Sequence, residues 1–246
     1  MHWPYSGTLL IIGLPLPFVF FLPIYLYHTL RENDQSVGKY ATVIFFMVFF
    51  AVESSMLAVN VSREIIDNSL SLNQSIGTSV SYFDKQNAIY LKQVDSSKLE
   101  SAQQITKLTT QLTDYMKQAK IQLLIAVNEA NKAAITSENT IDWNKIKGLD
   151  DRSSAELYFC FPETKYGANN LYRLLVDYKT KVLKVTENAP SEKIDFLKTV
   201  LIQEDTNYEL WLRNNFDEMP LVGIMNTLEL MQQQVKIAEN ASLKLL

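Results

Sequence analysis

One segment sets the organisation of this chain: YATVIFFMVFFAVESSMLAVNV, from Tyr40 to Val61. It is apolar apart from one acid, Glu53, and a few small polar residues, and it contains no lysine, arginine or proline. A helix rises about 1.5 Å per residue, so a helix over this segment is long enough to cross a hydrocarbon core about 30 Å thick. The segment therefore predicts a membrane-spanning helix with a carboxyl group inside it.

Glu53 is the residue of this segment that most needs a reason. A mid-membrane acid costs roughly 2.5 to 3.5 kcal/mol on insertion scales, so such residues usually face a bundle interior, a water path or a partner. Ser54 and Ser55 are its polar neighbours in sequence. The residues nearest to it on the helix surface are apolar, namely Phe49, Phe50, Met56 and Leu57. A functional Glu53 therefore needs a partner from another chain, and the alternative is a protonated or locally satisfied acid without a role.

A second apolar segment, Thr8 to Tyr27, precedes the first and is also uncharged, but it contains Pro15, Pro17 and Pro23. No lysine or arginine lies before it, which argues against a signal peptide and favours a retained, kinked spanning helix. The loop between the two segments carries Arg31 and Lys39. Positive loops favour the cytoplasmic side, so the remainder of the chain is expected outside the cytoplasm.

Composition excludes several classes of function. The net charge is -4, and the charges beyond Val61 are interspersed, so no nucleic-acid surface is expected. Cys160 is the only cysteine, and both histidines, His2 and His28, lie before the polar region. These features predict no metal site, no cofactor and no catalytic residue. An enzyme is the least favoured class.

The polar remainder of the chain is predicted to be helical. No proline interrupts the chain from Tyr40 to Val94, so one continuous helix is expected there, with a break near Asn60 to Ser62 or at Gly77 as the alternative. Ser97, with Glu100 three residues later, predicts the cap of a second long helix that ends near Ala134. The two helices are expected to form an antiparallel pair.

Further helices are expected after an irregular connection from Thr136 to Ala168. The periodicity predicts helices from Asn169 to Asn188, from a cap at Ser191 to about Leu201, and from Tyr208 to Phe216. The last helix, Pro220 to Leu246, carries residues at three- and four-residue spacing that predict a packed face: Leu221, Ile224, Leu228, Met231, Val235, Ala238, Ser242 and Leu245. This face can serve the interior of the bundle or an intermolecular pair.

The expected fold is all-α, with two N-terminal transmembrane helices followed by a bundle of long helices. Its parts are residues 1–39 for the proline-rich span and cytoplasmic loop, 40–61 for the second span and 62–246 for the helical domain. Two segments then resemble the GldM/PorM family of gliding motility and type 9 secretion. These are MLAVNVSRE, residues 56–64, and FDEMPLVG, residues 216–223, with Thr227, Leu228 and Glu239 after it.

The resemblance, which covers roughly residues 42 to 246, implies a bacterial inner-membrane protein with its helical domain in the periplasm. It implies a homodimer in contact with membrane lipid and surrounded by a GldL-like multi-span ring, expected as a pentamer, that uses the proton-motive force. It also implies contact with outer-membrane-associated machinery through further β-rich C-terminal domains, which are expected to be missing from this sequence.

The resemblance is incomplete at the membrane. Family members usually have one span, preceded by a basic residue that pairs with an acid of the ring, so Lys39, and after it Arg31, are the candidate cations here. An acid on the spanning helix itself resembles the MotB/ExbD class, although Glu53 lies deeper. The candidate residues for proton coupling or partner contact are Glu53, Lys39, Arg31, Ser54 and Ser55. The competing interpretation is a membrane-anchored helical binding or sensor protein without ion coupling.

Overall fold

The structure is a computed structural model, and it describes Ile24, Tyr27 and residues 37–137, 140–161, 163–187, 190–201 and 207–246. Side chains are described only in part before residue 66. The chain forms two compact units, Met1–Ile65 and Ile66–Leu246. Each unit is considered by itself below. Most of the first predicted span, Thr8 to Tyr27, lies outside the described residues.

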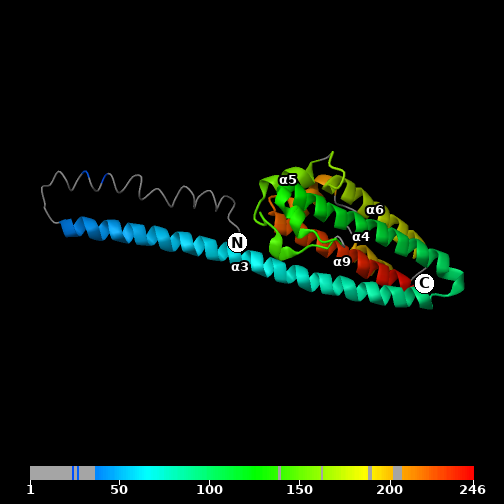
Figure 1. The fold of residues 1–246 in the computed structure, drawn as a ribbon. Helices are drawn as coiled ribbons and strands as arrows, with labels where there is room; N and C mark the ends of the chain where they lie inside the picture. The colour runs from blue at the N-terminus through cyan, green and yellow to red at the C-terminus, as the bar shows by residue number, and fades with distance from the viewer. Residues whose placement is uncertain are drawn as a thin grey trace. The chain divides into compact units, whose positions relative to one another are not determined.

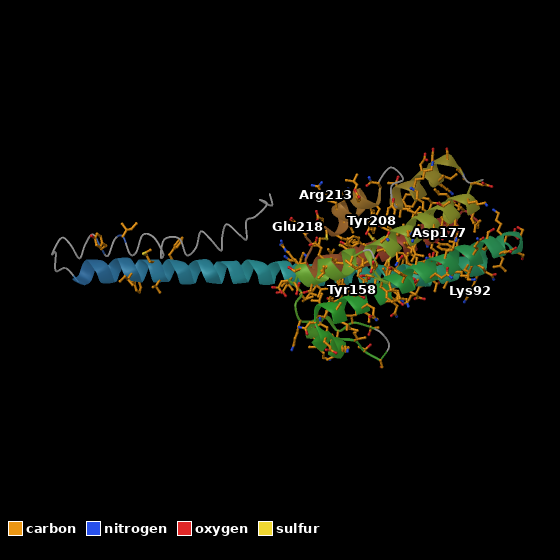
Figure 2. The ribbon with its side chains drawn as sticks, turned by 90° about the horizontal axis from the view of Figure 1, so that it is seen from above. Lys92, Tyr158, Asp177, Tyr208, Arg213 and Glu218 are labelled. Atoms are coloured by element: carbon orange, nitrogen blue, oxygen red, sulfur yellow. The ribbon has the colours of Figure 1, made fainter. Side chains whose placement is uncertain are left out.

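The long helix expected from Tyr40 to Val94 is present as α3, Val37–Gln93 (Figure 1). Neither Asn60 to Ser62 nor Gly77 interrupts it, so the prediction of one uninterrupted helix is confirmed and the predicted alternative break is wrong. Lys92 lies in its last turn, where a cation is favourable at the negative end of the helix dipole (Figure 2). Within the residues open to description, no helix has both the length and the apolar character that crossing a bilayer requires.

The unit Ile66–Leu246 is a bundle of helices, as predicted (Figure 1). A short 3-10 turn, Ser96–Lys98, joins α3 to α4, and the two helices run in opposite directions. The helices after the turn are α4 Leu99–Val127, α5 Ser153–Cys160, α6 Ala168–Val185, α7 Ser191–Val200, α8 Tyr208–Phe216 and α9 Leu221–Leu243. Between α4 and α5 lie two further 3-10 turns, Glu129–Ala134 and Trp143–Lys145, and one isolated antiparallel bridge between Ile135 and Ile141.

Four local predictions are wrong. The second long helix ends at Val127 and not near Ala134, because Asn128 is extended and a separate 3-10 turn, Glu129–Ala134, follows it. Ser97 does not cap α4, because the Asp95 side chain accepts a hydrogen bond from its amide and holds it inside the 3-10 turn. Ser191 is the first residue of α7, and the backbone oxygen of Pro190 before it accepts the first helical hydrogen bonds. The connection from Thr136 to Ala168 is not wholly irregular, because α5 lies within it.

The apolar core joins α4, α5, α6, α7, α8 and α9. The predicted face of α9 is its inward face, since Leu221, Ile224, Leu228, Met231, Val235 and Ala238 all belong to the core, and Leu245 packs at its margin. Aromatic rings close one side, where the ring centroids of Phe159 and Phe216 are 4.8 Å apart. Among the residues that the structure describes, none of α3 belongs to this core cluster.

Candidate functional site

The sequence-predicted site residues lie in the first unit. The backbone of Lys39, Glu53, Ser54 and Ser55 is part of α3, whereas their side chains lie outside the described part of the structure. Arg31 lies outside the described residues altogether. The structure therefore fixes the helical setting of Glu53 and leaves its coupling role a prediction.

A different group of polar residues stands out where α3 meets α9 in the second unit. We call it the polar seam, and its members are Asn73, Ser79, Asp84 and Asn87 of α3 with Asn226, Gln233, Lys236, Glu239 and Asn240 of α9. At one end, Asn73 Nδ2 donates to Asn226 Oδ1 at 2.9 Å, and in the middle Gln233 Nε2 donates to Ser79 Oγ at 2.7 Å. At the other end, Asn240 Nδ2 donates to Asn87 Oδ1 at 2.8 Å.

The pairing of the polar seam has one register. Partners are separated in sequence by 153 residues at Asn73 and Asn226, 154 at Ser79 and Gln233, and 153 at Asn87 and Asn240. A constant difference between residue numbers means that α3 and α9 run in the same direction. Lys244 continues the register, because its ammonium lies 4.9 Å from the ring centroid of Tyr90.

A charged cluster lies within the polar seam. Lys236 Nζ is 2.7 Å from Asp84 Oδ1 and 3.3 Å from Glu239 Oε2, and Asn87 Nδ2 donates to the same Glu239 oxygen at 2.7 Å. Burial raises the pKa of Glu239, and the Lys236 ammonium and the Asn87 amide offset only part of that effect. Burial by itself lowers the pKa of Lys236, but the carboxylates of Glu239 and Asp84 raise it above its ordinary value.

A second buried ion pair lies beside the seam. Lys120 of α4 donates to Glu229 of α9, and its Nζ also lies 3.2 Å from Gln232 Oε1. Burial lowers the pKa of Lys120, although the Glu229 carboxylate opposes this change. Next to the pair is a cavity of about 310 Å³ bounded by α3, α4, α9 and the loop at residues 140–143, and its lining residues include Gly77, Asp84, Lys117 and Trp143.

This arrangement is suited to holding helices together. Its amide, carboxylate and ammonium groups bind one another across three helices. Within the residues searched, no group of histidine, cysteine or acidic side chains is arranged to hold a metal ion. Cys160 is half-buried, and burial raises the pKa of its thiol to about 11, which keeps it protonated and unreactive near neutral pH.

Sequence reasoning missed the polar seam although a signal for it was present. Asn73, Val80 and Asn87 are spaced by seven residues, and so are Asn226, Gln233 and Asn240. Buried asparagines at heptad spacing are typical of helix pairs in which a polar contact specifies register. The last helix therefore has two faces, an apolar one toward the core and a polar one toward α3.

Comparison with protein families matches residues 60–246 to the GldM N-terminal domain. The chain belongs to the GldM/PorM family. The matched part includes all of the second unit and residues 60–65 of the first, and it confirms the family resemblance, with all of residues 216–223 and the last five of residues 56–64 inside the match. The GldM family works in gliding motility and type 9 secretion. No curated protein matched the chain.

Proposed function

We propose that this chain is an inner-membrane motor subunit that, with a GldL-like ring protein, converts proton-motive force into periplasmic motion for gliding, type 9 secretion or both. The observation that carries the proposal is the family match over residues 60–246. The match begins within α3, whose sequence before that point is the apolar segment Tyr40 to Val61. A single helix that contains both parts supports a role in passing movement from one to the other.

In this proposal Tyr40 to Val61 spans the inner membrane and residues 62–246 lie in the periplasm. Glu53 takes up and releases a proton, or pairs with a polar group of the surrounding ring, with Ser54 and Ser55 beside it. Lys39, and after it Arg31, pairs with an acid of the ring near the cytoplasmic side. The chain acts as a homodimer within a ring of five subunits, performs no enzymatic reaction, and passes movement to outer-membrane-associated machinery.

The test replaces the acid while keeping its shape. Glu53→Gln is expected to abolish gliding or type 9 secretion at an unchanged protein level, because an amide cannot exchange a proton at physiological pH. Glu64→Gln is the matched control, since the same change on the same helix falls just beyond the apolar segment. Glu53→Gln cells that secrete and glide at the wild-type rate would contradict the coupling role of this residue.

The partner is tested separately by purification of the intact protein from membranes in a mild detergent. The expected result is a complex with a multi-span ring protein that survives Glu53→Gln. Isolation of the chain alone, with no multi-span partner at any detergent concentration that preserves other membrane complexes, would favour the anchored binding or sensor protein instead.

A further inference from the structure

We propose that the part of α3 from Ile66 to Gln93 is a releasable helix. It docks on α9 through the polar seam, and it leaves that surface while the core formed by α4 to α9 stays folded. The proposal concerns the second unit alone and does not depend on the motor function proposed above.

The first argument is the composition of the docking surface. In the described residues of α3, the buried side chains are Asn73, Ile76, Val80 and Asn87, so half of them are polar. By contrast, α4 buries apolar side chains along its whole length, among them Ile105, Leu112, Met116, Leu123 and Leu124. Apolar burial is the main favourable term in folding, so α3 contributes little to the stability of the unit compared with α4.

The second argument is the fate of the polar groups on release. Asn87, Lys236 and Glu239 are buried when α3 is docked, and removing charged and amide groups from water is costly even when they are paired. When α3 leaves, water replaces the contacts that these groups lose. The face of α9 that becomes exposed is hydrophilic, because it carries Asn226, Gln233, Lys236, Glu239 and Asn240.

The third argument is the incomplete packing under α3. A solvent-facing pocket of about 310 Å³ lies between α3, α4 and α9, and its lining includes the exposed residues Ser81, Asp84 and Lys117. Gly77 borders it, and a Cβ added at this position would meet no atom within 4 Å. Close packing normally makes a buried helix interface resist opening, and here part of that packing is absent.

The connection to α4 permits the movement. Residues 94–98 form a short turn held by local hydrogen bonds, from the amide of Val94 to the oxygen of Tyr90 and from that of Lys98 to the oxygen of Asp95. A turn of this kind allows α3 to swing away without disturbing the start of α4. Release therefore breaks the polar seam and leaves the aromatic and aliphatic contacts of the core in place.

The test measures how fast a buried thiol reacts with a small alkylating reagent in the intact chain, with Cys160→Ser removing the natural thiol. Val80→Cys reports on the α3 interface, and Val182→Cys, buried in the core on α6, is the matched control. Val80→Cys is expected to react at least about tenfold faster, because local release needs less free energy than global unfolding. Equal rates that both follow global unfolding would overturn the proposal.

Ile76→Cys against Ile105→Cys repeats the comparison if either valine variant fails to fold. A second arm separates release from static exposure. Asn73→Leu with Asn226→Leu converts one polar layer of the seam into an apolar one, which is expected to slow the labelling of Val80→Cys about tenfold by strengthening docking. Labelling that is as fast in this background as in its absence would contradict release as the route to the thiol.

Discussion

Glu239 is a buried carboxyl group whose negative charge shares one ammonium, that of Lys236, with Asp84. Its pKa is raised because burial penalises the charged form more than Lys236, Asn87 and Thr106 of α4 together favour it. The groups that face it are Lys236 on its own helix, Asn87 and, through Lys236, Asp84 of α3, and Tyr178 of α6, whose hydroxyl it influences electrostatically. The ionisation of Glu239 therefore makes the stability of the fold depend on pH.

The sign of that dependence follows from the raised pKa. In the unfolded chain the group titrates near 4.5, and in the folded protein it keeps its proton to a higher pH. The stability that this proton contributes is fully present below about pH 4.5 and is lost as the pH rises through the folded-state pKa. Glu239→Gln is therefore expected to gain stability relative to wild type as the pH rises, measured by urea unfolding from pH 4 to pH 8.

The opposite result would contradict this expectation. If wild type gained stability relative to Glu239→Gln with rising pH, the attraction of Lys236 for the Glu239 carboxylate would outweigh the effect of burial. Asp84→Asn is the useful comparison, because Asp84 shares the same ammonium while its side chain is half exposed. When the Asp84 carboxylate is removed, Lys236 pairs with Glu239 only. The free energy of unfolding should then depend less on pH.

Close packing around Gly167 leaves no room for a larger side chain. A Cβ there would lie 2.9 Å from the backbone oxygen of Phe159 and 3.1 Å from Thr164 Cβ. Gly167→Ala is therefore expected to lower the free energy of unfolding by about 1 to 3 kcal/mol, the usual cost of overpacking. Urea unfolding in detergent measures the change, and a variant as stable as wild type would show that the loop before α6 yields without cost.

At the scale of single elements, Gly77 gives the opposite expectation in the middle of α3. No atom lies within 4 Å of the position that a Cβ would take, so alanine fits without displacement. Alanine loses less backbone entropy than glycine on helix formation, and Gly77→Ala should stabilise α3 by roughly 0.5 to 1 kcal/mol. Amide hydrogen exchange across residues 70–90 checks this, with Gly167→Ala as the contrasting glycine.

A loss of protection in Gly77→Ala would contradict the open space seen at this position. The same measurement applied to Gly223 of α9 is a further control, because a Cβ there would touch Met219 and Pro220 at 3.4 Å. No gain in protection is expected from that change.

Elements with strong periodicity were predictable from sequence, and those held by distant contacts were not. The inward face of α9 and the length of α3 follow from apolar spacing and the absence of proline. In contrast, α5 is only eight residues long, and its position depends on Phe159 packing against Phe216, far away in sequence. The cap at Ser97 failed because Asp95, two residues earlier, competes for its amide.

The candidate site divides in the same way. Glu53 was visible because a lone acid in an apolar segment breaks a simple pattern. The heptad spacing of the asparagines was visible in the sequence, but it does not identify the partner helix, which only the pairing across about 153 residues shows. Charge and composition identify single unusual residues, whereas contacts between residues that are distant in sequence can be identified only from the three-dimensional structure.

For the whole molecule, stability is expected to reside in α4 to α9. Ile105→Ala on α4 should cost about 2 to 5 kcal/mol, the range for truncating a fully buried isoleucine. Ile76→Ala on α3 should cost less than this range, because that side chain lies outside the core cluster beside a polar interface. Urea unfolding of both variants in one detergent tests the difference.

Equal losses for the two variants would place α3 within the same cooperative unit as the core. The exposures of the two side chains are close, 4% for Ile76 and 0% for Ile105, so the comparison reflects their surroundings.

The shared direction of α3 and α9 has a mechanical consequence. Because the helices are parallel, the end of α9 lies beside the end of α3, where Lys244 contacts Tyr90, and not beside the start of the second unit at Ile66 (Figure 1). A pull on the entering end of α3 against a pull on Leu246 would therefore slide one helix along the other. The asparagine layers at Asn73 and Asn87 would then be loaded in shear at the same time, instead of breaking one after another.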